Sequence, residues 1–116
     1  GCGVENRPDR DRSGVVKRAL AGSGSEYTWG PSALLEGIGV SREKKDLTFV
    51  MANGQKITRS VGFAIIRLDK YFTVDEVVFA EPGDLTLLGA RTLEGLSLTV
   101  DSRRKKPVAS GRILAA

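Results

Sequence analysis

Histidine is absent from this chain of 116 residues, and cysteine occurs once, at Cys2. Without histidine, neither a Ser-His-Asp or Cys-His nucleophile nor a histidine-ligated metal centre can form. Serine and threonine hydroxyls therefore have no histidine base to activate them. With one cysteine no disulfide can form within the chain, and we interpret Cys2 as part of a terminal tail.

Long apolar runs are also lacking, and aromatic residues make up only 6% of the chain. No run approaches the roughly 18 apolar residues that a membrane span needs, and no segment looks like a signal peptide. We therefore expect no membrane association and a cytoplasmic location, which the single cysteine also favours. No aromatic residue adjoins the densest basic run, residues 102–106, so we expect a solvated turn there and no specific nucleic-acid binding.

What the chain contains is the composition of one folded domain. Hydrophobic residues make up 41% of it, too many for a disordered segment, and the length suits a single domain. We divide it into a polar N-terminal segment or hairpin arm, residues 1–14, and one domain, residues 15–116. The net charge of +4 permits weak attraction to polyanions but does not require it.

Apolar periodicity predicts a mainly β fold with one or two short helices. Residues 15–21 have the pattern of a strand, and alternating runs flank Asn53-Gly54, a dipeptide that favours a two-residue type I′ hairpin turn. Short helices are expected near residues 31–38 and 90–94. Regular strand–helix alternation, which marks a parallel α/β fold, is missing.

Three further interpretations concern single residues. We expect Trp29 in the core and Tyr27 half-buried with a hydrogen bond. Asp75 and Glu76 are neighbours on a predicted strand and point to opposite faces, so we interpret them as edge or turn residues rather than a catalytic pair.

The Gly/Ser segment "AGSGSEY" follows an apolar run and could be a working loop or a plain turn. It lacks the lysine that a P-loop requires after Gly24, and Tyr27 stands where a dinucleotide fingerprint needs its third glycine. Glu26 would also repel a phosphate. Phosphate binding is therefore disfavoured, and a turn between strand and helix remains open.

Four longer segments carry a resemblance to a known family. "ALAGSGSEYTWGPSALLEGIGV" resembles the active-site segment of the retropepsin-like aspartic peptidases, especially their small bacterial single-domain group, in which an apolar strand leads into D-[TS]-G-[AS]. "LTLLGARTLEGLSLTVD" is similar to the second signature of the family, "VMANGQKITRSVGFAIIRL" falls where the family has its flap, and "RRKKPVASGRILAA" is similar to the tail of the bacterial group. Together these segments cover about residues 15–116.

This resemblance implies a retropepsin-like fold, a closed β-barrel half with one or two short helices. It also implies an endopeptidase that pairs as a homodimer, brings one Asp from each copy to a shared site, acts on an extended peptide or protein substrate, and uses no cofactor or metal. On the family pattern Ser23 takes the Thr/Ser place, Gly24 the Gly place and Ser25 the Ala/Ser place. The catalytic Asp falls on Gly22.

The resemblance also points to substrate-binding residues in the flap and cleft. These are Ser25, Ala52, Asn53 and Gly54.

Gly22 carries no side chain for proton transfer, and general acid–base groups typically contribute roughly 10²–10⁴-fold each. We therefore expect a peptidase-like domain that is inactive as written, a pseudoenzyme or an altered enzyme. Two alternatives stay open: a working peptidase in which another carboxylate such as Glu26 compensates, and a non-enzymatic peptide-binding or dimerisation module on the same fold.

Overall fold

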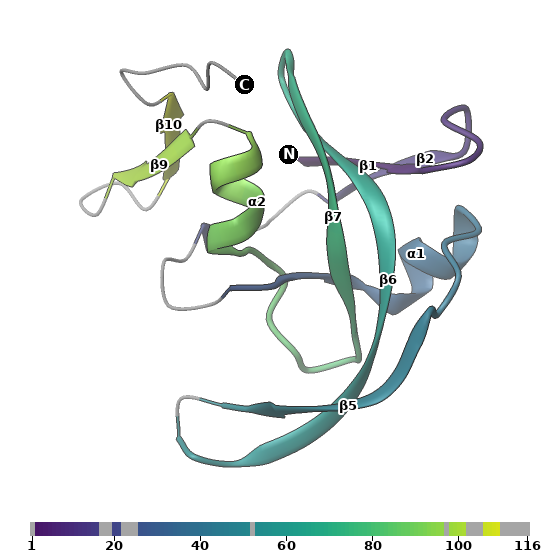
Figure 1. The fold of residues 1–116 in the computed structure, drawn as a ribbon, viewed down its shortest axis with the longest axis vertical. Helices are drawn as coiled ribbons and strands as arrows, with labels where there is room; N and C mark the ends of the chain where they lie inside the picture. The colour runs from purple at the N-terminus through teal and green to yellow at the C-terminus, as the bar shows by residue number, and fades with distance from the viewer. Residues whose placement is uncertain are drawn as a thin grey trace.

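One curled eight-stranded sheet organises the chain (Figure 1). The computed structural model describes residues 2–16, 20–21, 26–51, 53–96, 98–101 and 106–109. The strands are β1 (Cys2–Asn6), β2 (Ser13–Val16), β3 (Leu20–Ala21), β4 (Thr28–Pro31), β5 (Lys44–Val50), β6 (Lys56–Leu68), β7 (Tyr71–Ala80), β8 (Leu87–Leu88), β9 (Leu98–Asp101) and β10 (Lys106–Ala109). The helices in the described ranges are α1 (Ser32–Gly37) and α2 (Ala90–Gly95).

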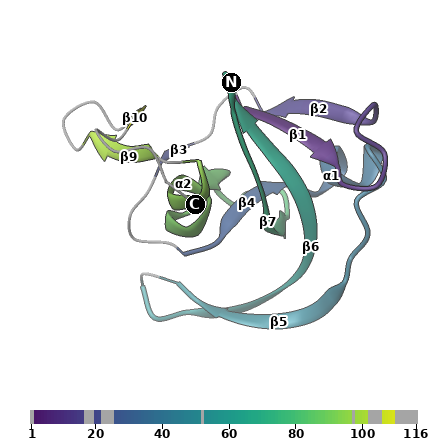
Figure 2. The same cartoon turned by 45° about the horizontal axis from the view of Figure 1, so that its top comes forward.

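The sheet runs in the order β2-β1-β6-β7-β4-β8-β3, and β5 pairs with β6 beside this path. The 13-residue β6 is long enough to pair with β5 through its first half and with β1 through its second half. β5 and β6 therefore sweep in an arc around β4 and α2 (Figure 2). The expectation of a mainly β fold with short helices is confirmed, in the form of a curled half-barrel sheet.

The core lies on one face of β6 and β7, where apolar residues alternate with outward-facing ones. Ala64 and Ile66 of β6 and Val77 and Phe79 of β7 are all buried on this face. The rest of the main cluster is Cys2, Val4, Val16, Leu35, Ile38, Val40, Leu88, Leu93 and Leu96. The interpretation of Cys2 as part of a terminal tail is wrong, because Cys2 is the first residue of β1 and is buried in this cluster. Burial raises the pKa of its thiol to about 11.

Helix α1 begins directly after Pro31, whose φ of −58° suits the entry to a helix. It ends in a Schellman motif, because the amide of Gly39 donates to Glu36 and that of Val40 donates to Leu35. Gly39 has the positive φ, 83°, that this motif requires. The short helix predicted for this segment is confirmed, and its Leu35 is fully buried.

The hairpin between β5 and β6 differs from the predicted two-residue type I′ turn. The amide of Gly54 donates to the carbonyl of Met51, and the amide of Met51 donates to the carbonyl of Gln55. A type I′ turn needs positive φ at both central residues, but of Asn53 and Gly54 only the glycine has one, 84°. The Asn53 side chain instead accepts the Gln55 amide at 2.9 Å, which holds the loop in a longer form.

Several other predicted elements are confirmed. The second helix and the strand that begins at Leu98 are present, and Trp29 is buried while Tyr27 is half-buried. The predicted strand 15–21 is observed as the end of β2 and as β3, with residues 17–19 outside the described ranges. Of the basic run 102–106, Lys106 begins β10, and the other residues lie outside the described ranges. No helix in the described ranges is long and apolar enough to span a membrane.

A bidentate ion pair fixes the turn that follows β7. Arg59 Nε and Nη2 donate to the two carboxylate oxygens of Asp84 at 2.7 and 2.9 Å, and the Glu81 amide donates to the same carboxylate at 2.8 Å. The Arg59 guanidinium and then the Glu81 amide hold the pKa of Asp84 below its usual value, against the opposing effect of burial. The charged form of Asp84 therefore stabilises the fold.

Replacing Asp84 with Asn should lower the free energy of unfolding at pH 7 by about 1–3 kcal/mol, because Arg59 loses its charged acceptor. The folded pKa of Asp84 lies below the unfolded one, so the contribution is complete above about pH 4 and is lost as the pH falls through the folded pKa. Urea unfolding at a series of pH values measures this. The deficit of the variant should shrink in acid, and a deficit that is constant with pH, or equal to that of the exposed control Glu94→Gln, would contradict it.

Candidate functional site

The structure describes only part of the site that the sequence predicts. Asn53 and Gly54 lie exposed at the turn of the β5–β6 hairpin. The remaining candidates lie outside the described residues: Gly22, Ser23, Gly24, Ser25 and Ala52.

The described strands bring the two signature-like segments together. β3 pairs in parallel with β8, with Leu20 opposite Leu87 and Ala21 opposite Leu88. β4 meets β8 from the other side, where Trp29 is opposite Leu87. The chain that enters the Gly/Ser segment at Ala21 therefore lies beside the chain that enters Gly89, although the two are far apart in sequence.

Gly89 packs directly against the backbone that follows the Gly/Ser segment. A Cβ at this position would lie 2.4 Å from the carbonyl carbon and oxygen of Tyr27 and 2.5 Å from the carbonyl oxygen of Glu26. Backbone hydrogen bonding continues the contact, because the Arg91 amide donates to the Glu26 carbonyl at 3.3 Å. The φ of Gly89 is −81°, which any residue adopts, so close approach alone requires a glycine here.

A buried chain of hydrogen bonds links the same segments. The Gly89 amide donates to Thr28 Oγ1 at 2.9 Å, Thr28 Oγ1 contacts Thr92 Oγ1, and Thr92 Oγ1 donates to Asp75 Oδ2 at 3.0 Å. A carboxylate only accepts, so the Thr92 proton points to Asp75 and the Thr28 proton points to Thr92. We refer to this chain from Gly89 to Asp75 as the relay. Each of its bonds has one donor and one acceptor, and together the bonds join β4, β7 and α2.

Asp75 and Glu76, interpreted above as edge or turn residues, lie within β7 and not in a turn. Their side chains are mostly buried and oppositely oriented: Asp75 accepts from Thr92, while Glu76 accepts from Lys44 at 3.0 Å. Arg91 lies between the two carboxylates, with Nη1 3.5 Å from Glu76 and Nη2 4.0 Å from Asp75. Both acids are thus committed to structural ion pairs.

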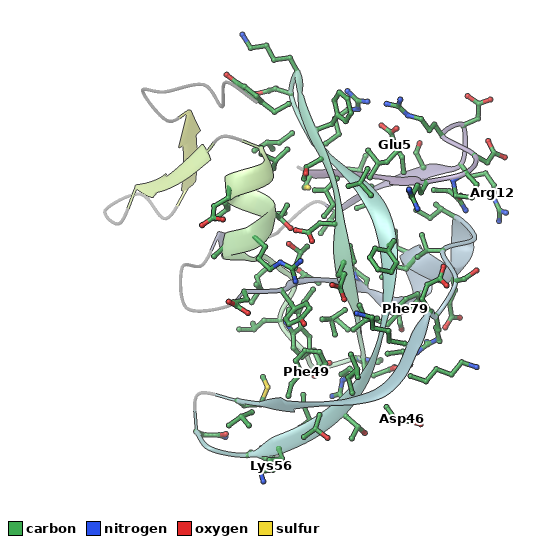
Figure 3. The ribbon with its side chains drawn as sticks, in the orientation of Figure 1. Glu5, Arg12, Asp46, Phe49, Lys56 and Phe79 are labelled. Atoms are coloured by element: carbon green, nitrogen blue, oxygen red, sulfur yellow. The ribbon has the colours of Figure 1, made fainter. Side chains whose placement is uncertain are left out.

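An apolar surface lies between β4 and the β5–β6 hairpin. Phe49 of β5 is labelled in Figure 3. Its ring meets that of Trp29 edge-on at 5.2 Å and that of Tyr27 at 5.4 Å between centroids. Leu47, Ile57 and Leu87 pack on the same cluster and are only partly buried. This surface could contact apolar side chains of an extended ligand under the hairpin.

The described residues around the β3–β8 junction offer hydrogen bonding and apolar contact. Glu26 is exposed at the start of this segment, and Asp75 and Glu76 are held in ion pairs with Arg91. No group of three or more His, Cys, Asp or Glu side chains in the described ranges is placed to hold a metal ion. Comparison with protein-family models, curated proteins and solved structures found no match to this chain.

Sequence reasoning missed Thr28, Thr92 and Asp75 as a linked set. Thr28 and Thr92 are 64 residues apart, and a single threonine has no distinctive pattern. One feature of the sequence could have indicated part of it. Thr92 lies beside Leu93 on the inward face of the predicted helix, and a buried polar side chain needs a hydrogen-bond partner.

Replacing Gly89 with Ala should cost about 3 kcal/mol of unfolding free energy, because the added methyl overlaps the Tyr27 carbonyl and only backbone movement can relieve it. Chemical denaturation measures the change. Gly37→Ala is the matched control, since nothing lies within 4 Å of a Cβ there, and we expect it to stay within about 0.5 kcal/mol of the parent. Equal stabilities for the two variants would refute the close approach.

Replacing Thr92 with Val keeps the side-chain shape but leaves Thr28 and Asp75 without their shared partner. The unfolding free energy should fall by about 1–3 kcal/mol, while the exposed control Thr48→Val should change it by less than about 0.5 kcal/mol. Thermal or urea unfolding of both variants distinguishes these outcomes. A neutral Thr92→Val would mean that the relay does not stabilise the fold.

Proposed function

We propose that the chain is a retropepsin-like aspartic peptidase domain in which Gly22 occupies the position of the catalytic Asp, so that the domain lacks peptidase activity. The observation that carries the proposal is the parallel pairing of β3 with β8, followed by the contact of Gly89 with the backbone of Glu26 and Tyr27. The resemblance links these same two segments as its first and second signatures.

Peptide hydrolysis in such a domain depends on two carboxyl groups that share a proton at a dimer axis. One acts as general base on a water and the other donates a proton to the substrate carbonyl. Gly22 offers neither group, and Ser23 has no histidine to activate it. The chain would therefore have the backbone arrangement of a peptidase site but no side chains for acid–base catalysis.

The proposal includes a homodimer, because a half-site of this family is complete only when two copies pair. It also includes an extended peptide or protein ligand held between β4 and the β5–β6 hairpin. The partly buried apolar cluster of Tyr27, Phe49 and Leu87 supports such a ligand. A cytoplasmic location, favoured by the single cysteine, belongs to the same proposal.

A second candidate function is a non-enzymatic peptide-binding or dimerisation module on the same fold. The apolar surface under the hairpin favours it, since peptide binding by strand addition needs pockets for alternate side chains but no carboxylate. It differs from the first candidate only in that peptide binding or dimerisation is itself the function of the domain.

Replacing Gly22 with Asp should restore pepstatin-sensitive cleavage of an unfolded protein substrate, because it supplies one carboxyl from each copy of the dimer. Cleavage is measured by the release of acid-soluble fragments between about pH 3 and 7. The matched control is Gly22→Asn, which adds a side chain of similar size that cannot act as an acid or base, and it should be inactive.

The proposal fails if a folded, dimeric Gly22→Asp variant cleaves nothing in this pH range. It also fails if Gly22→Asn is as active as Gly22→Asp, because the activity would then not depend on a carboxyl group.

A further inference from the structure

Apolar side chains are exposed on one face of β6 and β7. They lie at the end of these strands that is near β1. Directly opposed residues of antiparallel strands share a face, and the register pairs Arg67 with Phe72, Ile65 with Val74 and Phe63 with Glu76. On this face Phe72 is 51% exposed and Val74 is 46% exposed. Phe63 is also among the exposed large hydrophobic residues.

Cationic side chains surround these apolar residues. The Arg10 and Arg67 guanidinium groups lie 5.4 and 5.0 Å from the centre of the Phe72 ring, and Lys44 Nζ lies 5.9 Å from that of Phe63. We refer to Arg10, Lys44, Phe63, Arg67, Phe72 and Val74 as the basic–aromatic face.

The acidic partners of these cations lie underneath them. Glu5 accepts from Arg10 at 3.0 Å and from Arg67 at 2.7 Å, and these bonds lower its pKa. Yet the Glu5 side chain is only 13% exposed, against 51% for Arg10, and Glu76 is 12% exposed, against 48% for its partner Lys44. The face therefore presents mostly positive groups and apolar groups to solvent, because its three cations, Arg10, Arg67 and Lys44, share only two carboxylates, Glu5 and Glu76.

Two hollows adjoin the basic–aromatic face. One, of about 470 Å³, lies between β7 and α2 and has Val74 and Arg91 in its wall. The other, of about 340 Å³, has Phe63 and Arg7 in its wall. Acidic side chains also line both hollows, Asp75 and Glu94 in the first and Glu43 in the second, so the hollows extend the face with mixed charge and do not themselves select an acidic ligand.

We propose that the basic–aromatic face docks an acidic amphipathic segment of a partner protein. Apolar side chains of the segment contact Phe72, Val74 and Phe63, and its carboxylates reach Arg10, Arg67 and Lys44. Arg10 and Arg67 suit this role because a guanidinium can bind a carboxylate while remaining stacked on an aromatic ring. Its residues differ from those of the ligand region between β4 and the hairpin, although both regions lie on the same face of β6, where Val61 of the apolar cluster precedes Phe63 by two residues.

Two other occupants fit less well. A nucleic-acid base would need a free ring to stack on, but both guanidinium groups already lie over Phe72. A second copy of the same face would bring its exposed cations against those of the first, which is unfavourable for a chain of net charge +4.

Fluorescence anisotropy with defined probes tests the proposal. The probes are a labelled peptide of alternating Glu and Leu, a matched peptide of alternating Lys and Leu, and an oligothymidylate. The full chain should bind the Glu-Leu peptide saturably, with an affinity that falls as salt rises, and should not bind the Lys-Leu peptide.

Two independent variants locate the binding. Phe72→Ser and Arg10→Gln should each weaken binding of the Glu-Leu peptide by about tenfold or more. The controls are Leu85→Ser, which removes an exposed apolar side chain beyond the opposite end of β7, and Lys56→Gln, which removes a cation at the hairpin end of β6, away from Glu5 (Figure 3). Both controls should bind within about twofold of the parent.

The proposal is overturned if the parent chain does not bind the Glu-Leu peptide, or if the controls weaken binding as much as the two variants. Oligothymidylate that competes with the peptide would assign the face to nucleic acid instead. Self-association that is lost in Phe72→Ser would assign it to a second copy of the chain.

Discussion

The contact between Gly89 and the backbone of Glu26 and Tyr27 is the constraint on which the rest of the molecule depends. It brings the end of β8 against the segment that follows the Gly/Ser sequence, and only a residue without a Cβ allows this distance. The contact also sets where α2 begins, because Gly89 is the residue before the helix. Once α2 is there, Thr92 can complete the hydrogen-bonded relay from Gly89 to Asp75. The backbone contact and the polar relay thus reinforce the same junction, since the relay begins at the Gly89 amide.

The contacts that hold this junction together do not depend on the residue at position 22. Neither the β3–β8 pairing nor the relay through Thr28 and Thr92 involves the side chain at position 22. A carboxylate there would face its copy across the proposed dimer axis, and like charges close together oppose ionisation and are costly to desolvate. If the proposed function holds, a glycine at position 22 removes the acid–base group without removing any described contact between β3, β8 and α2.

The sequence predicts those parts of the fold that local rules determine. The alternation along β6 and β7 and the glycine that ends α1 specify their elements directly. The hairpin was predicted in the right place with the wrong turn, because Asn53-Gly54 suits more than one loop and the choice depends on the pairing of Met51 with Gln55. The relay could not be predicted, since it joins Thr28, Asp75 and Thr92 across three elements, and isolated threonines have no distinctive spacing. The proposed peptidase site was predicted from the resemblance alone, because composition and periodicity do not say which loop faces which strand.

The most direct measurement is a crystal structure of the full chain that shows residues 22–25, together with the molecular mass of the chain in solution. The account predicts a two-fold dimer in which the two copies of Gly22 face each other across the axis, each at the end of β3 and beside β8. A monomer in solution, or a dimer whose axis lies away from Gly22, would contradict it.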